Sequence, residues 1–192
     1  MNEKLFLSFD DISGEENFYY YKITHCNFDW SISKLLKSEY LEGNDNNLIE
    51  NVLSSYGTLQ RYTNYKLSLP NKDVGFKISG NYILEILDSD DNIILKRKFL
   101  ILNEKVRVDL NIYPSQNKDR FYTHQNVQFI IGTNGYKIRN PNNDIKVTVI
   151  QNDQWDNSKI ILKPQFIEKD RLVYMFGTST FPILDCRYLV TP

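Results

Sequence analysis

The sequence predicts an all-β chain built from two tandem immunoglobulin-like antiparallel β-sandwich domains. Three observations lead to this fold class. Aromatic residues make up 14% of the 192 residues and are mostly Tyr and Phe, a composition typical of sheets. Apolar residues recur at every second position in short segments, which is the period of a strand with one buried face. Turn-forming clusters of Asp, Asn and Ser separate these segments, and no helical pattern alternates with them, which argues against βαβ units.

The first half of the chain carries the clearest strand patterns. Within Tyr19–Cys26, odd-numbered residues would face one side of a strand and even-numbered residues the other. Asp88–Asn92 has turn composition and predicts a hairpin. Helical spacing occurs in Ser31–Tyr40, which we expect to form one short helix or an ordered loop, and Asn44–Leu53 is a weaker helix candidate. The expected strands of this half are Leu5–Phe9, Tyr19–Cys26, Tyr65–Leu69, Tyr82–Leu87 and Ile93–Leu102.

The second half has the same kind of pattern but no sequence repeat of the first. Turn chemistry at Asn134–Gly135, Asn140–Asn143 and Asp156–Ser158 separates its strands. A long strand ends at Leu102–Lys105 and a new alternating set begins, so we predict domains at residues 1–103 and 104–192. The expected strands of this half are Val106–Ile112, Val127–Ile131, Ile145–Val149 and Leu172–Phe176.

Charge and motif content exclude several classes of function. The formal net charge of -1 gives no electrostatic footprint for nucleic acid. The phosphate-binding glycine motifs, the EF-hand pattern and closely spaced cysteine pairs are all absent, so we predict no cofactor and no metal site. No apolar run is long enough for a transmembrane helix. The first residues lack the pattern of a signal peptide, which leaves open a cytoplasmic protein or a fragment.

The chain contains two histidines and two cysteines, and their positions argue against a catalytic dyad. His25 and Cys26 are adjacent, and adjacent residues of a strand face opposite sides, so they cannot make the contact that a nucleophile and its base require. We expect His25 and His124 to serve packing or structural hydrogen bonds, and Cys26 and Cys186 to be independent buried thiols. A remote carboxylate pair for glycoside hydrolysis stays open, but nothing points to one.

Two tryptophans stand beside turns that are rich in polar residues. Trp30 follows Asn27–Asp29, and Trp155 lies within Gln151–Asn157. A tryptophan in this setting can stack on a sugar or anchor a partner protein. Alternatively, each tryptophan can be buried in the open end of its own sandwich. We favour this interpretation because tryptophan is usually largely buried.

The order of segments along the chain is more informative than any single segment. Taken together, the segments resemble the N-terminal part of the plug protein family of the type IX secretion system of Bacteroidota. The blocks that carry the resemblance are LSFDD at Leu7–Asp11, YYYKITHCNFDW at Tyr19–Trp30, SEYLEG at Ser38–Gly43, TLQRYTNYKLSLPN at Thr58–Asn71, SGNYILEI at Ser79–Ile86, THQNVQFIIGTNGYKIRNP at Thr123–Pro141, DIKVTVIQNDQWDN at Asp144–Asn157 and LKPQF at Leu162–Phe166.

This resemblance implies a non-enzymatic periplasmic protein made of tandem β-sandwiches. Such a protein closes the periplasmic mouth of an outer-membrane translocon barrel, so the implied partner is that barrel, and the implied location is the periplasm at the outer membrane. It would be peripheral to the membrane and would not span it. Family members carry a signal peptide and are longer than this chain, so we expect a fragment or a shortened relative. Whether the second domain is complete stays open.

Residues of the types that anchor protein interfaces give the candidate contact set for the barrel: Trp30, Arg61, Tyr62, Arg139 and Trp155. The principal rival is a carbohydrate-binding or adhesion module, in which the tryptophans would form one stacking platform. A second rival is a sandwich-fold hydrolase, which requires carboxylates or a histidine–nucleophile pair to converge in a cleft.

Overall fold

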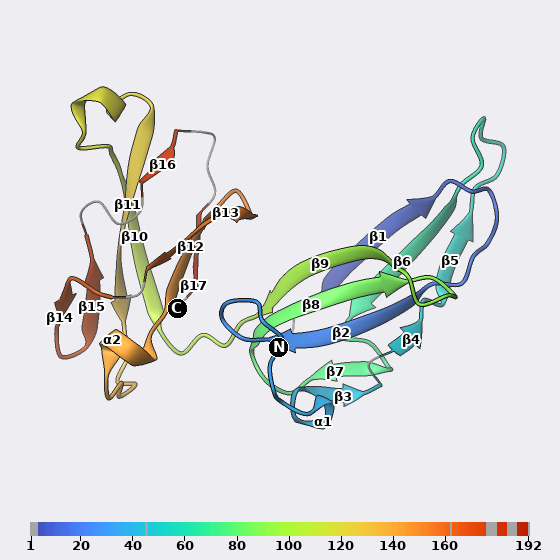
Figure 1. Ribbon diagram of the computed structural model, residues 1–192, viewed down its shortest axis with the longest axis horizontal. Coiled ribbons are helices and arrows are strands. Elements are labelled where there is room, and N and C mark those ends of the chain that lie inside the picture. Colours follow the sequence, from blue (N-terminus) through green and yellow to red (C-terminus); the bar gives the residue numbers. More distant parts are fainter. Residues whose placement is uncertain (1–3, 45, 162, 176–179, 184–187, 192) are drawn as a thin grey trace. The chain divides into compact units, whose positions relative to one another are not determined.

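A computed structural model describes residues 4–44, 46–161, 163–175, 180–183 and 188–191. The chain separates into two compact units, residues 1–103 and residues 104–192 (Figure 1). Strands dominate both units, and every pairing between the described strands is antiparallel. The predicted all-β class is therefore confirmed. The immunoglobulin-like character of the sandwiches stays a prediction.

Unit 1 contains two larger sheets and a small third one. One sheet has the order β1-β6-β5, the second has the order β4-β2-β8-β9, and β3 pairs with β7. The elements are β1 (Leu5–Asp11), β2 (Tyr20–Cys26), α1 (Lys37–Tyr40), β3 (Leu41–Gly43), β4 (Asn46–Leu48), β5 (Asn51–Ser54), β6 (Thr63–Leu69), β7 (Val74–Phe76), β8 (Gly80–Leu87) and β9 (Ile93–Ile101).

The core of unit 1 lies between its two larger sheets and is rich in tyrosine. Tyr21 and Ile23 of β2 are buried, as the alternation predicts, and they share one cluster with Tyr65 and Leu67 of β6. Tyr65 stacks on Phe9 with ring centroids 5.2 Å apart. A buried tyrosine needs a partner for its hydroxyl. The hydroxyl of Tyr65 meets this need because it donates to the carbonyl oxygen of Asn17 at 2.7 Å and accepts from that residue's N–H at 2.9 Å.

One of the two helix predictions in unit 1 requires correction. Ser31–Tyr40 contains a short helix in its last four residues, and Ile32 before it makes an isolated bridge with Cys26. The helix prediction for Asn44–Leu53 is wrong, because this stretch forms β4, which pairs with β2, and most of β5, which pairs with β6. Pairing at the sheet edges, with β2 for β4 and with the next strand β6 for β5, outweighs the weak local helix preference there. Cys26 is buried and is a free thiol, whereas Cys186 lies outside the described residues.

Unit 2 is also built from antiparallel sheets. The order of one sheet is β10-β11-β15-β14, with β16 added to β11, and the order of the other is β13-β12-β17. The elements are β10 (Arg107–Pro114), the 3₁₀ helix η1 (Lys118–Arg120), β11 (His124–Gly132), α2 (Pro141–Asp144), β12 (Val147–Gln151), β13 (Gln154–Ile161), β14 (Phe166–Ile167), β15 (Arg171–Tyr174), β16 (Thr180–Pro182) and β17 (Tyr188–Thr191).

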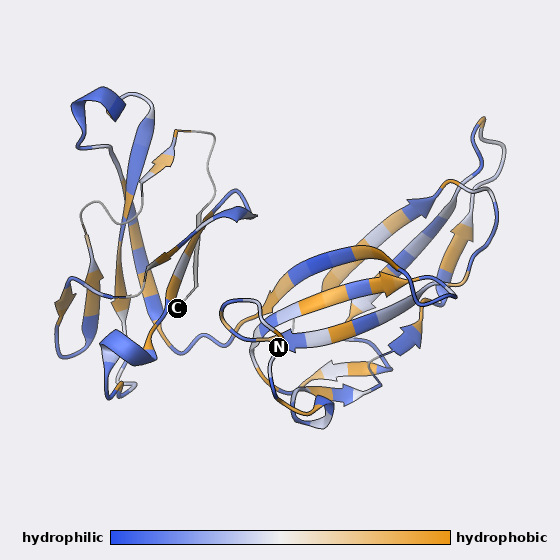
Figure 2. Cartoon of the chain, in the orientation of Figure 1, coloured by the Kyte–Doolittle hydropathy of each residue, from blue (hydrophilic) through white to orange (hydrophobic). Residues whose placement is uncertain are grey.

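The core of unit 2 joins inward-facing residues of its two sheets. Val127, Phe129 and Ile131 of β11 pack in one cluster with Val147 and Val149 of β12. These five positions follow the period of two that predicted both strands. Figure 2 shows the resulting contrast between hydrophobic and hydrophilic residues along the strands of each unit.

Two turn predictions in unit 2 differ from the structure. Asp156–Ser158 lies inside β13, and the actual turn of that hairpin is Asn152–Asp153, whose φ angles are 54° and 57°. Asn and Asp tolerate this left-handed backbone better than most residues, which explains their place at a two-residue hairpin turn. The segment predicted as a turn at Asn140–Asn143 begins the short helix α2, with Pro141 in its first turn. The last predicted strand ends at Tyr174, and Phe176 lies outside the described residues.

Candidate partner-binding site

Trp30 lies in a tight turn that follows β2. Its φ angle of 66° is left-handed, and its N–H donates to the carbonyl oxygen of Asn27 at 3.0 Å. The side chain of Asp29 accepts from the N–H and the hydroxyl of Ser31 at 3.1 Å and 2.6 Å. The amide of Asn81 on β8 donates to the carbonyl oxygen of Asn27 at 3.0 Å, which ties the turn to the sheet. Trp30 is therefore held in a fixed place.

The indole of Trp30 is half-buried against its own unit. The ammonium nitrogen of Lys98 on β9 lies 4.9 Å from the centre of the ring, a cation–π contact. Part of the ring surface is thus covered within unit 1, and the remaining part is accessible to a partner.

Arg61 and Tyr62 lie in the loop of residues 55–62, which joins β5 to β6. Both side chains are exposed. The loop is closed at its base, where the N–H of Ser55 donates to the carbonyl oxygen of Tyr62 at 2.8 Å and the hydroxyl of Ser55 accepts from the N–H of Tyr62 at 2.9 Å. The two candidate side chains therefore stand on an ordered loop.

The structure does not bring Trp30 and the pair Arg61 and Tyr62 together. Trp30 follows the last residue of β2, whereas the 55–62 loop lies beside the segment that precedes β2 (Figure 1). At about 3.3 Å per residue, the strand Tyr20–Cys26 puts roughly 20 Å between its two ends. These three candidates thus belong to opposite ends of unit 1.

The candidates of unit 2 are also separated from each other. Arg139 is exposed in the segment that leads into α2. Trp155 is half-buried in β13, directly after the Asn152–Asp153 turn. Strand β12 runs from the α2 side to that turn and so lies between them. Each unit contains one of the two tryptophans, so neither unit can form a two-tryptophan sugar platform on its own.

A hydrogen-bonded carboxylate orders the end of unit 1 that carries the 55–62 loop. Asp11, the last residue of β1, accepts from the N–H of Ser13 at 2.9 Å, from the side-chain amide of Asn17 at 2.8 Å and from the hydroxyl of Tyr19 at 2.9 Å. Burial by itself would raise the pKa of Asp11, but these hydrogen bonds outweigh it and lower the pKa. Burial and the bond to Asp11 together raise the pKa of Tyr19 to about 12.

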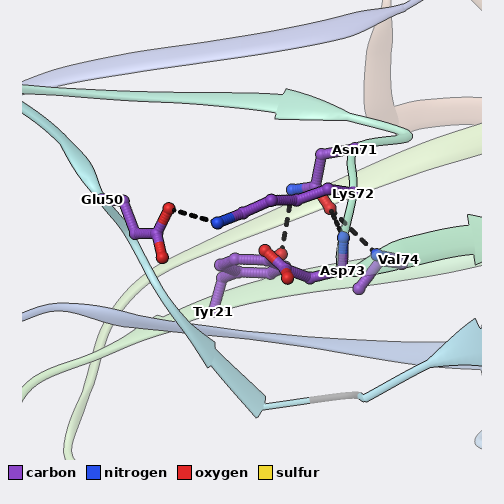
Figure 3. A network of polar contacts seen from close by, with 6 residues as sticks. All are labelled: Tyr21, Glu50, Asn71, Lys72, Asp73 and Val74. Atoms are coloured by element: carbon purple, nitrogen blue, oxygen red, sulfur yellow. Dashed lines mark hydrogen bonds and ion pairs between the residues drawn. The ribbon is translucent and has the colours of Figure 1, made fainter.

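A polar network marks another edge of unit 1 (Figure 3). The side-chain amide of Asn71 donates to the hydroxyl of Tyr21 at 2.9 Å, and its oxygen accepts from both N–H groups of Asp73–Val74 at 2.9 Å. Beside it, the ammonium nitrogen of Lys72 lies 2.8 Å from a carboxylate oxygen of Glu50. The network joins the turn between β6 and β7 to the buried face of β2 and to the segment between β4 and β5.

A pocket of about 350 Å³ adjoins this network. Its walls include the apolar side chains of Leu7, Ile49 and Leu67. Two acidic and two basic side chains also line it, and one pair of these, Lys72 and Glu50, already neutralises itself. Because these charges balance, the pocket offers no excess charge for an ionic ligand. We interpret the network as a structural joint.

Sequence reasoning missed two residues that the structure makes prominent. Tyr56 and Leu59 are fully exposed on the 55–62 loop, beside the predicted Arg61 and Tyr62. A signal was present in the sequence, because bulky apolar residues stand singly among Ser, Gly, Thr and Gln in this segment. Among the described residues, no group of three or more His, Cys, Asp and Glu side chains is placed to hold a metal ion. None of the described helices combines the length and apolar character needed to cross a bilayer.

The first 103 residues match the sequence model of the first domain of type 9 secretion system plug proteins. The chain belongs to this family. The match covers more than half of the 192 residues and the whole of unit 1. It confirms the resemblance that the ordered sequence blocks predicted.

One solved structure extends the likeness of this plug-family chain across both units. A hypothetical protein from Parabacteroides merdae ATCC 43184, known from its crystal structure, is 32% identical, and the superposition has a TM-score of 0.90. The match covers 95% of this chain and 47% of that protein, so the chain spans about half of its relative's length. A search of curated protein sequences gave no match.

Proposed function

We propose that this chain acts as a plug that closes the periplasmic mouth of the type IX secretion translocon barrel by steric occlusion. The observation that carries the proposal is the match of residues 1–103 to the first domain of plug proteins. In this proposal the protein is located in the periplasm and is peripheral to the outer membrane. It works without chemistry on a substrate.

The physical requirements of a plug agree with what the two units offer. A plug needs a body that keeps its shape under load, together with an interface that is large enough to hold and weak enough to release. Paired antiparallel sheets with separate apolar cores supply rigid bodies. Loops closed by hydrogen bonds, such as the one that presents Arg61 and Tyr62, supply contact surfaces that need little further ordering on binding.

Not all five contact candidates are equally suited to this proposal. Because Trp30 lies at the other end of unit 1 from Arg61 and Tyr62, a contact centred on the 55–62 loop is not expected to have Trp30 at its centre. The 55–62 loop is the better candidate, since Arg61 is exposed and Tyr56 and Leu59 beside it are fully exposed, whereas part of the Trp30 ring is covered by Lys98.

The proposal is tested in the host by deleting the gene and measuring entry of large hydrophilic solutes across the outer membrane. Deletion is expected to increase entry, and a plasmid copy of the gene is expected to reverse it. A second deletion, of the barrel gene, must abolish the increase, because the leak is expected to pass through open barrels. Unchanged permeability in the single deletion, or a leak that persists without the barrel, contradicts the proposal.

A further inference from the structure

The 55–62 loop of unit 1 presents apolar side chains outward while its polar groups bond to one another. The hydroxyl of Thr58 donates to the carbonyl oxygen of Gln60 at 2.7 Å, and Ser55 bonds to the backbone of Tyr62. Such internal bonds fix a loop in one conformation before any partner arrives. The shape of this loop is therefore set by its polar residues, and its apolar residues are left free for another purpose.

The exposed apolar residues of the 55–62 loop lie beside one exposed apolar residue of the β1–β2 loop. Tyr56 and Leu59 are fully exposed, Tyr62 is partly exposed, and Ile12 of the neighbouring β1–β2 loop is 69% exposed. The side chain of Gln60 donates to the carbonyl oxygen of Ile12 at 3.1 Å, so the two loops are joined. We call these four residues, Ile12, Tyr56, Leu59 and Tyr62, the apolar tip. Figure 2 shows the 55–62 loop extending from the end of unit 1 with a hydrophobic residue near its extremity.

Leaving such residues in water forgoes stabilisation. Burial of a leucine-sized side chain stabilises a fold, so a fold gains nothing by displaying one at full exposure. Single exposed apolar residues are ordinary, but a group carried on two tied loops is a mark of an interaction site. The apolar tip thus has the properties of a prebuilt anchor.

The charges around the apolar tip select the kind of surface that it can enter. The neighbouring segment Asp10–Glu16 carries four carboxylates and no basic residue, whereas the 55–62 loop carries only Arg61. The hydroxyl of Thr63 donates to the carbonyl oxygen of Glu15 at 3.1 Å, which places this acidic segment at the base of the loop. An acidic surround is repelled by the anionic headgroups of a bilayer, but it complements a protein pocket with a basic rim.

We propose that the apolar tip is an anchor that enters an apolar pocket with a basic rim on the translocon barrel. This inference rests on the proposed function and adds the contact itself. Tyr56 and Leu59 fill the pocket, and the exposed carboxylates of Glu15 and Glu16 face its rim. Tyrosine is among the residues most often found at the energetic centre of an interface.

The test measures the affinity of this chain for the purified barrel in detergent. Leu59→Ser and Tyr56→Ser are expected to weaken binding about tenfold or more each, as truncation of an anchor residue does. The matched controls are Tyr122→Ser in unit 2, where the side chain is 87% exposed, and Ile94→Ser on β9, where it is 53% exposed. Both controls remove a comparable exposed apolar group elsewhere and are expected to leave the affinity unchanged.

The acidic surround is tested separately, by the double variant Glu15→Gln/Glu16→Gln. Its association rate is expected to fall at low salt and to depend less steeply on salt concentration. All the substituted side chains are exposed, so each variant is expected to keep the thermal unfolding midpoint of the parent chain, which is measured for every one of them. An association rate with the same salt dependence as that of the parent chain contradicts the role assigned to the carboxylates.

Four outcomes overturn the inference, and they separate it from the proposed function. Full-strength binding by the two tip variants, or equal weakening by the two controls, contradicts the anchor role of the apolar tip but leaves the proposed plug function intact. Binding of the parent chain to phosphatidylglycerol-containing vesicles that Leu59→Ser abolishes assigns the tip to a membrane instead. Failure of the parent chain to bind the barrel at all removes both proposals.

Discussion

His25 is a buried ionisable side chain in an aromatic environment. Its ring lies 5.0 Å from that of Tyr82 and 5.6 Å from that of Tyr40, measured between centroids. A Cβ atom added to Gly80 would lie 2.6 Å from the Nε2 atom of His25, so the ring is also closely covered by backbone. Among the described residues, its Nδ1 atom has no hydrogen-bond partner. The ring therefore contributes to the packing of the core, and its protonated, charged form would be poorly solvated there.

This environment predicts an acid-sensitive fold. Burial lowers the pKa of His25 below its ordinary value of 6.5. Below that pH the unfolded chain binds a proton that the folded chain resists, so the free energy of unfolding falls as the pH drops through 6.5 and is unaffected above it. His25→Phe removes the proton site and is expected to lose less stability than the parent chain as the pH falls below 6.5.

The measurement is urea unfolding followed by the fluorescence of Trp30, in a Trp155→Phe background so that the signal reports unit 1. The stability of each protein at pH 8 is the reference for its own loss on acidification. At pH 8, His25 of the parent chain is neutral in both the folded and the unfolded state. Parallel loss of stability in the two proteins on acidification would show that His25 does not carry the effect.

At the scale of elements, the pairing of β3 with β7 depends on a glycine. Gly43 closes β3 with a φ of 90° and pairs with Val74 of β7. A Cβ atom at this position would lie 1.9 Å from the carbonyl oxygen of Asp73, which is far inside contact distance. Gly57 has a similar φ of 70°, but a Cβ atom there would meet nothing within 4 Å. A side chain at Gly57 would suffer only the strain of a left-handed backbone, whereas a side chain at Gly43 would suffer both that strain and a steric overlap. Comparing the two positions therefore isolates the cost of the overlap.

Gly43→Ala is expected to destabilise unit 1 more than Gly57→Ala does. Both variants incur the cost of a left-handed alanine, about 1 kcal/mol, and only Gly43→Ala must also displace the backbone of Asp73, just before β7, for a total of about 2–4 kcal/mol. Urea unfolding gives the two free energies, and amide exchange of residues 41–43 and 74–76 locates the damage. An equal loss of unfolding free energy in the two variants would mean that the backbone beside Gly43 moves away from the added methyl group without destabilising unit 1.

The strands that sequence alone predicted are those whose burial pattern is local. In β2, Tyr21 and Ile23 had to share a face because successive side chains of a strand alternate. β4 and β5 were mistaken for a helix because they are short edge strands without a clear alternating pattern, and β4 takes its conformation from the distant strand β2. The same limit applies to the candidate site. Aromatic residues beside turns were recognisable, but the full exposure of Tyr56 and Leu59 depends on how two distant loops are tied together.

At the scale of the whole molecule, the two units have separate apolar cores. The buried cluster of unit 1 draws only on residues up to Phe99, and that of unit 2 begins at Val127. The connection between β9 and β10 is exposed from Leu102 to Lys105 and belongs to no strand. A cut after Asn103 therefore removes no strand and no buried contact of the first cluster. Since a domain is stabilised chiefly by its own core, unit 1 satisfies the condition for folding alone.

We therefore expect residues 1–103 to fold when produced without unit 2. The fragment should show a β-type far-ultraviolet spectrum, one cooperative thermal transition and dispersed amide signals, because its sheets and core are complete within it. It should also retain binding to the barrel that Leu59→Ser weakens, since the apolar tip lies in unit 1. A fragment without a cooperative transition would show that unit 1 needs unit 2 for stability. If the fragment folds but no longer binds the barrel, the decisive contact lies in residues 104–192. That result would contradict the claim that the apolar tip is the principal anchor.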